Sequence, residues 1–150
     1  MTDRKALTEL LRLRWSDGTV SVRGKLIGID DVEALGVYEN GRLQGIATWL
    51  VEGGTLYLAT MNNVTDRRGV STALLDAMIA LGREKRFPVL RALISNDNTK
   101  AIRFYQRRGF RIVAAHIGII DMMRRLKPSI PEKGIDGIPM RDEIELEMVL

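Results

Sequence analysis

Residues 89–110 read VLRALISNDNTKAIRFYQRRGF, and this stretch holds a strand, a turn and a helix in direct succession. Val89–Ile94 is an almost continuous apolar run, which is typical of a strand covered on both faces. Residues 98–108 are expected to form a helix, capped at its start by one of Asn96, Asp97 or Asn98. Gly109 is placed to end this helix, so that Phe110 can fold back onto Tyr105.

A second helix precedes this stretch. The segment begins after Gly69 and has Gly82 near its end. Its apolar side chains recur with the helical period and share one face: Val70, Leu74, Ala77, Met78 and Leu81. The pattern therefore predicts a helix that buries this face.

Three apolar segments between residues 35 and 61 predict an antiparallel meander. Asn40-Gly41 and Gly53-Gly54 separate them, and Asn-Gly between apolar runs indicates a hairpin because both residues tolerate positive φ. The predicted strands are Leu35–Tyr38, Leu43–Val51 and Leu56–Met61.

The two ends of the chain add further elements. Thr2 or Asp3 can cap a first helix that carries Leu7, Leu10 and Leu11 on one stripe. Thr19–Val22 alternates like a short strand, and residues 24–34 are expected to form a loop. Another strand is predicted over Phe110–Ile117, whereas residues 121–126 have no clear pattern.

The last predicted strand alternates strictly between two kinds of side chain. Ile144, Leu146, Met148 and Leu150 share one face, and Glu143, Glu145 and Glu147 share the other. Together the elements predict an α/β (α+β) fold, with a mixed, mostly antiparallel sheet of about six or seven strands and helices on both faces. We expect a single domain over residues 1–150, since this length is usual for one domain.

Composition excludes several kinds of chemistry. The chain has no Cys, which excludes disulfides, thiolate metal sites and an acyl group carried on an enzyme thiol. A single histidine, His116, removes histidine-rich metal sites and weakens a Ser–His–Asp interpretation, so we expect no metal. The net charge of +4 favours an anionic ligand. The sequence has neither a signal-peptide core nor an apolar stretch long enough to cross a membrane. It therefore predicts a cytoplasmic protein without a membrane partner.

The junction Asn63-Val64-Thr65-Asp66-Arg67-Arg68-Gly69-Val70-Ser71-Thr72 leads from a predicted strand directly into a helix. Small residues there leave backbone N–H groups uncovered, and the positive end of a helix dipole suits phosphate. Arg67 and Arg68 add positive charge. The alternative is a solvated turn whose glycine is required only by its backbone angles.

Together with residues 98–110, this junction resembles the GNAT superfamily of N-acetyltransferases. The second family motif, an Asn, an Ala, Phe-Tyr and Gly-Phe, matches at Asn98, Ala101, Phe104, Tyr105, Gly109 and Phe110. The first family motif corresponds to the junction at residues 66–71. There Asp66 occupies the position usually held by Arg or Gln, and Ser71 stands where Gly or Ala is usual. The resemblance implies a GNAT-like fold that binds acetyl-CoA in a cleft between two splayed parallel strands.

The resemblance also implies roles for individual residues. The backbones of Met61, Asn62 and Val64 would run beside the pantetheine arm. Asn98 would bond the pantetheine amides, and Tyr105 would protonate the leaving thiolate. The pyrophosphate would be held by the N–H groups of Arg67, Arg68, Gly69, Val70, Ser71 and Thr72.

Each role has a structural alternative. Asn98 is also a good helix cap, and Tyr105 also fits as a half-buried core aromatic. Residues 55–63 contain no acidic side chain, so the Glu that often acts as base in this family is missing. His116 has a suitable pKa, but a lone histidine in a strand is more often structural, and water held by Asn62 or Asn63 is another option.

The predicted function is therefore transfer of an acetyl group from acetyl-CoA to an amine, on a small molecule or peptide, by direct attack in a ternary complex. A non-catalytic acyl-CoA sensor on the same fold is the first alternative. A nucleic-acid-binding module is the second, suggested by Arg103, Arg107 and Arg108, but the small excess charge and few aromatics argue against a nucleic-acid partner. The identity of the amine and the oligomeric state stay open, a homodimer being one alternative.

Overall fold

A computed structural model describes Glu9 and residues 19–150 of the chain. The predicted helix with Leu7, Leu10 and Leu11 lies outside the described residues. The strands are β1 (Thr19–Val22), β2 (Lys25–Gly28), β3 (Glu33–Glu39), β4 (Arg42–Glu52), β5 (Thr55–Asn63), β6 (Val89–Ser95), β7 (Arg111–His116) and β8 (Glu143–Val149). The helices are α2 (Val70–Glu84), α3 (Thr99–Arg107) and α4 (Ile119–Leu126), with short 3₁₀ turns at Ile29–Asp31 and Ile135–Gly137.

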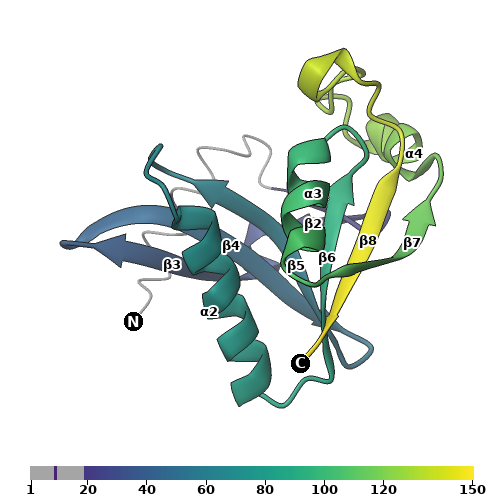
Figure 1. Ribbon diagram of the computed structural model, residues 1–150. Coiled ribbons are helices and arrows are strands. Elements are labelled where there is room, and N and C mark those ends of the chain that lie inside the picture. The colour runs from purple at the N-terminus through teal and green to yellow at the C-terminus, as the bar shows by residue number, and fades with distance from the viewer. Residues whose placement is uncertain (1–8, 10–18) are drawn as a thin grey trace.

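A six-stranded sheet with the order β3-β4-β5-β6-β8-β7 forms the centre of the molecule (Figure 1). All neighbouring strands in it are antiparallel except β5 and β6. The predicted mixed, mostly antiparallel sheet is thus confirmed. The parallel pair arises because α2 carries the chain back across the sheet between β5 and β6, as parallel strands require.

The predicted hairpin turns form where the sequence places them. Asn40 and Gly41 both have positive φ, 50° and 74°, as the tight turn between β3 and β4 requires. Gly53 and Gly54 also have positive φ, in the turn between β4 and β5. Each strand of the meander extends one or two residues beyond its predicted ends, because ladder pairing continues to the turns.

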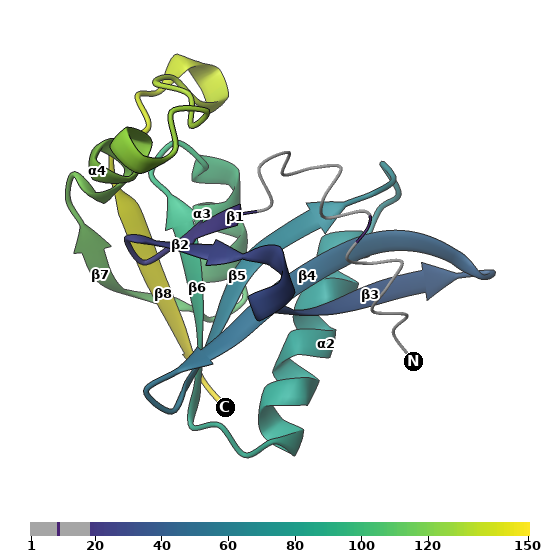
Figure 2. The same ribbon diagram turned by 180° about the vertical axis from the view of Figure 1, so that it is seen from behind.

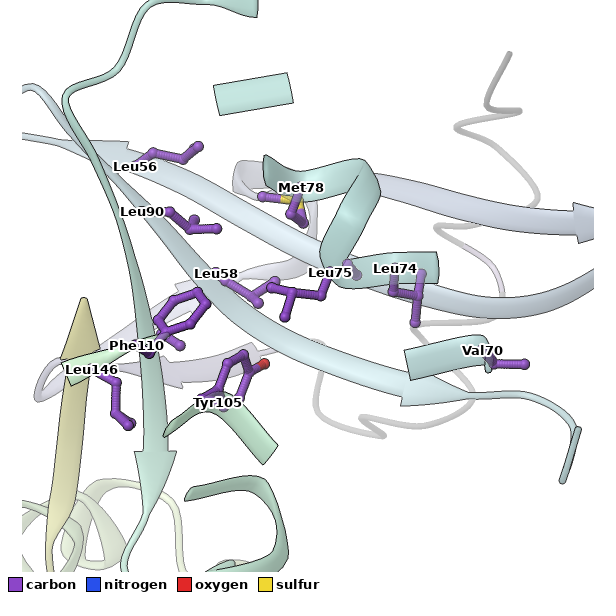
Figure 3. Close-up of a cluster of buried hydrophobic side chains, with 12 residues drawn as sticks. Leu56, Leu58, Val70, Leu74, Leu75, Met78, Leu90, Tyr105, Phe110 and Leu146 are labelled. Carbon is purple, nitrogen blue, oxygen red and sulfur yellow. The ribbon is translucent and has the colours of Figure 1, made fainter. Parts of the chain in front are cut away.

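Helices α2 and α3 cover one face of the sheet, which we call the helix face (Figure 1). Their apolar side chains meet those of β4, β5, β6 and β8 in the main core (Figure 3). Phe110 folds back from Gly109, whose φ is 94°, and its ring lies 5.1 Å from that of Tyr105 in an edge-on contact. The predicted helix stop and its fold-back are confirmed.

The opposite face carries the β1–β2 hairpin, and we call it the hairpin face (Figure 2). Val22 of β1 packs there with Tyr57 and Leu93, each less than 10% exposed. The predicted loop over residues 24–34 is wrong, because Lys25–Gly28 pairs with Thr19–Val22. The turn between them, Arg23-Gly24, has positive φ at both residues. Arg is unusual at such a position, so the sequence contained no hairpin signal.

The C-terminal part completes the sheet and braces the hairpin. Residues 119–126, which include the stretch without a pattern, form α4. Lys127 at the end of α4 donates from Nζ to the carbonyl of Thr19 at 2.8 Å, which ties this helix to β1. The alternation in β8 is confirmed, and Leu146 lies in the main core.

Candidate active site

Strands β5 and β6 run side by side only at their start. They pair over Leu56–Leu58 and Leu90–Ala92, and beyond this point no ladder joins them. A β-bulge in β5 at Ala59 interrupts its register with β4 at this level. Because a bulge bends its strand, it accounts for the separation of β5 from β6.

A pocket of about 690 Å³ occupies the gap between the separating strands. Its walls come from β5, β6, the start of α2 and the inner side of α3. They are formed by Leu58, Ala59, Thr60, Met61, Asn62, Asn63, Ser71, Leu93, Ile94, Ser95, Asn98, Lys100, Ala101, Phe104 and Tyr105. Of the predicted site residues, the pocket brings together Met61, Asn62, Ser71, Asn98 and Tyr105.

This pocket is lined by side chains from both faces of the sheet. Ala101, Phe104 and Tyr105 belong to α3 on the helix face. Leu93 packs on the hairpin face, and strand alternation places Ser95 on the same face. The pocket therefore lies between the separated strands and is in contact with side chains of both faces.

Tyr105 sits at the helix-face wall with 2% of its surface exposed. Its ring packs between Phe104 and Phe110, and Figure 3 shows its hydroxyl directed away from Phe110. The hydroxyl lies 3.7 Å from Met61 Sδ, a weak acceptor. Burial raises the pKa of Tyr105 well above 10, so the phenol keeps its proton at neutral pH and can donate it to a better acceptor.

The backbone of β5 presents alternate residues to the gap. The Val64 N–H donates to the Gln44 carbonyl at 2.8 Å and is therefore satisfied within the sheet. Because backbone groups alternate along a strand, Asn62 faces β4 as Val64 does, whereas Met61 and Asn63 face the gap. Of the three residues predicted to present their backbone to the pantetheine arm, Met61 therefore faces the gap, whereas Asn62 and Val64 face β4.

The N-terminus of α2 lacks a side-chain cap. Gly69 at the cap position has φ 85°, and no side chain there accepts from the first N–H groups of the helix. The first N–H to find a partner inside the helix is that of Ala73, which donates to Gly69. The N–H groups of Val70, Ser71 and Thr72 precede it and have no intrahelical acceptor. An anion at this end would satisfy them.

The side chains around this helix start have other partners. Arg67 forms an ion pair with Glu39, outside the pocket. Thr72 Oγ1 accepts from Arg108, and Val70 is 4% exposed in the core. Ser71 Oγ donates to Asn63 Oδ1 at 3.2 Å, at the pocket wall. The groups of this segment that could bind an anion at the predicted site are therefore its backbone N–H groups and the exposed side chain of Arg68.

Two asparagines offer amide donors to the pocket. Asn98 Oδ1 accepts from the Ala101 N–H at 3.2 Å, so Asn98 is the helix cap among the three candidates. Its Nδ2 is not used by this cap. Asn62 Nδ2 is buried and has no hydrogen-bond partner in the structure. Such a donor costs about 1–3 kcal/mol unless an acceptor reaches it, so Asn62 indicates a ligand carbonyl in the pocket.

Carboxylates on the hairpin face were not identified as site candidates from the sequence. Glu145 is 2% exposed and contacts three basic side chains, Arg23 Nε at 3.1 Å, Arg91 Nη1 at 3.4 Å and His116 Nε2 at 2.7 Å. His116 thus has a structural partner and does not line the pocket. The sequence signal that could have identified these carboxylates was the row of glutamates at alternate positions of the last predicted strand.

Glu143 is the second buried carboxyl on this face. It is 8% exposed, and its Oε1 has no hydrogen-bond partner. Burial raises the pKa of Glu143 to about 7, against smaller lowering effects of His116 and Arg23. A carboxyl that titrates near neutral pH beside a pocket is suited to exchange protons there.

We expect Glu143 to make the protein less stable as pH rises from about 4.5 to about 7. In this window the folded protein keeps the proton that the unfolded chain releases, so unfolding becomes easier as pH rises. Glu143→Gln should therefore be more stable than the wild type by about 2–3 kcal/mol at pH 8 and nearly equal at pH 4. Urea unfolding at the two pH values measures this. Glu147→Gln is the control, and an equal gain at both pH values would contradict the expectation.

Among Glu9 and residues 19–150, no group of three or more His, Asp or Glu residues is arranged to hold a metal ion. None of the helices in the described part of the chain is long and apolar enough to cross a membrane.

Comparison with known proteins places this site in a family context. Residues 58–110 match the model described as the acetyltransferase (GNAT) family. The chain is 28% identical over 145 residues to the uncharacterized protein YdhI of Bacillus subtilis, covering 96% of this chain and 91% of YdhI. It is 26% identical over 133 residues to YxbD of the same organism, covering 88% of this chain and 84% of YxbD.

Solved structures share the fold at lower identity. An IAA acetyltransferase from Bacillus cereus superposes with a TM-score of 0.70 at 20% identity, covering 81% of this chain and 80% of that one. A GNAT family acetyltransferase from Elizabethkingia anophelis, with acetyl-CoA bound, gives 0.69 at 22%, covering 81% and 78%. A Bacillus subtilis acetyltransferase in complex with CoA gives 0.68 at 18%, covering 81% and 78%.

Proposed function

We propose that this chain, whose residues 58–110 match the acetyltransferase (GNAT) family, transfers an acetyl group from acetyl-CoA to an amine. The transfer is direct, within a ternary complex, because the chain has no Cys to carry the acetyl group. The acceptor is an amine of a small molecule or a peptide.

One observation carries this proposal: where β5 and β6 separate, a single pocket is lined by residues from both faces of the sheet. A thioester entering from the helix face and an amine entering from the hairpin face would meet between the strands. Such alignment alone can lower a barrier by roughly 7–11 kcal/mol. Two solved neighbours hold CoA or acetyl-CoA, which supports this choice of donor.

The residues at the helix face fit acetyl-CoA, which supplies an activated acetyl group as a thioester. The gap-facing backbone of Met61 and Asn63 would pair with the amides of the pantetheine arm, as a further strand would. Asn98 Nδ2 would donate to a pantetheine carbonyl. The uncapped N–H groups of Val70, Ser71 and Thr72 would hold the pyrophosphate, together with those of Arg67, Arg68 and Gly69.

Two side chains would act at the thioester itself. Asn62 Nδ2 would donate to its carbonyl oxygen and so stabilise negative charge that develops there. Tyr105 would donate from its hydroxyl to the departing sulfur. The Tyr105 ring is held between Phe104 and Phe110 before the ligand arrives, so little reorganisation of this group is needed.

Thermal and chemical unfolding with acetyl-CoA test the donor. At about 100 times its dissociation constant, a specific ligand adds roughly 2.7 kcal/mol to the free energy of unfolding. No stabilisation at millimolar acetyl-CoA would contradict the proposal.

Release of the CoA thiol in the presence of a panel of alkyl, aryl and peptide amines then tests catalysis. Stabilisation without thiol release over the whole panel would favour a sensor of acyl-CoA.

We expect Gly69→Val to weaken CoA binding by about tenfold or more. The side chain would stand among the N–H donors of α2, and φ 85° is strained for a β-branched residue. Gly118→Val is a matched control, because Gly118 is the uncapped N-cap of α4 with φ 75° and equally open surroundings. Calorimetric titration with CoA compares the two. Equal affinities would place the pyrophosphate elsewhere.

We expect Asp66→Gln to tighten CoA binding by a few-fold at low salt. Arg67 pairs with Glu39, so Asp66 does not orient this arginine, and its negative charge would repel bound phosphates. The gain should shrink as added salt screens the repulsion. Titrations of CoA at two salt concentrations measure it, and weaker binding in the variant would show that Asp66 supports the site instead.

A further inference from the structure

We propose that Glu143 binds the ammonium group of the acceptor on the hairpin face and accepts its proton. This inference rests on the proposed function, since it names the residue that receives the second substrate. It also supplies a candidate for the base that is missing from residues 55–63.

The position of Glu143 follows from the sheet register. Glu143 pairs with Ser95, the last residue of β6, and Ser95 lines the pocket. Directly opposed residues of antiparallel strands point to the same face, with their Cβ atoms about 4.5–5.5 Å apart. The Glu143 side chain therefore starts one ladder pair from the pocket wall, on the face from which the amine would enter.

The charges around Glu143 leave it without a cation of its own. Arg23 Nε and Nη1 pair with Glu145 and Glu52, and His116 Nε2 pairs with Glu145. On β6, Arg91 pairs with Glu145 and Glu147. None of the ion pairs within residues 19–150 includes Glu143. It accepts the backbone N–H of Arg23, and the nearby His116 and Arg23 lower its pKa without forming an ion pair with it. A bound ammonium group would supply the missing partner.

Burial is costly for a carboxyl without such a partner. Oε1 of Glu143 is shielded from solvent and lacks a hydrogen bond. A polar group kept in this condition destabilises the fold and is usually retained for function. The pKa of Glu143, about 7, lies closer to the pKa of an ammonium group than the pKa of an ordinary carboxyl does. This smaller difference favours proton transfer at neutral pH.

The proton balance of the reaction is complete. An N–H bond of the ammonium group breaks and an O–H bond forms at Glu143. The freed electron pair of nitrogen attacks the carbonyl carbon, a C–N bond forms, and the C–S bond breaks with its electrons on sulfur. Tyr105 gives its hydroxyl proton to this sulfur, and the second nitrogen proton restores the Tyr105 hydroxyl. Glu143 then releases its proton to solvent.

The first test needs no turnover. In CoA-loaded protein, ¹³C NMR of the Glu143 carboxyl should show a midpoint near pH 7, and n-butylammonium should lower this midpoint by at least about half a unit. Uncharged n-butanol should leave it unchanged. A midpoint near 4.5, or one that saturating n-butylammonium leaves in place, would overturn the proposal.

The second test uses an amine that the wild type acetylates. Glu143→Gln should lower kcat/KM by about 100-fold and remove the rise in rate through pH 7, while Glu143→Asp restores part of both. CoA affinity should stay unchanged in both variants and in Glu147→Gln, whose rate should be normal. If the wild type does not bind CoA, the proposed function is refuted. If CoA binding is normal and Glu143→Gln is fully active, only the role of Glu143 is refuted.

Discussion

Tyr105→Phe should lower kcat by about 100-fold while CoA affinity and thermal unfolding stay close to those of the wild type. The substitution keeps the ring, which packs between Phe104 and Phe110, and removes only the hydroxyl. The raised pKa of Tyr105 keeps the donor protonated at neutral pH. A positioned acid typically contributes 10²–10⁴-fold, and we expect the low end because transfer from so weak an acid to a thiolate is uphill.

Pre-steady-state release of the CoA thiol measures this effect on the chemical step. Tyr38→Phe is the matched control, since it makes the same change on β3 at a residue that is 41% exposed and outside the pocket. Its kcat should not change. Full activity in Tyr105→Phe would reduce Tyr105 to a core aromatic, and the thiolate would then leave without assistance.

Phe110→Ala should lower the free energy of unfolding by about 3–5 kcal/mol, as truncation of a buried aromatic does. Phe110 is 3% exposed, and its ring holds that of Tyr105 at 5.1 Å. Phe110→Leu, which fills most of the space, should cost less. Urea unfolding measures both losses. Ile112→Ala is the control, because Ile112 is 52% exposed and should cost little. A loss below about 1 kcal/mol in Phe110→Ala would contradict this packing.

Most elements could be predicted from sequence because their signals are local. Asn40-Gly41 takes the positive φ values that the turn between β3 and β4 requires, and the apolar stripe from Val70 to Leu81 becomes the buried face of α2. The β1–β2 hairpin could not be predicted, because Arg23 adopts a conformation that its own preferences oppose. Contacts made elsewhere hold it: its side chain pairs with Glu52 and Glu145.

The candidate site divides in the same way. The spacing of Asn98 and Tyr105 already places both on one helix, and the structure brings both to the pocket. Which backbone groups of β5 face the gap was not predictable, because it depends on the pairing of Val64 with Gln44 across two strands. The bulge at Ala59, which opens the gap, likewise appears only in the register between β4 and β5.

By itself the sequence determined the succession of strands and helices, the stop at Gly109 and the helix that carries Tyr105, because periodicity and turn chemistry act over a few residues. Only the tertiary structure decided the environment of the glutamates in β8. Alternation shows that Glu143 and Glu145 share a face, but their burial depends on β1–β2, more than a hundred residues away. Burial and ion pairing are long-range properties, and they distinguish Glu145, which pairs with Arg23, from Glu143, which has no ion pair within residues 19–150.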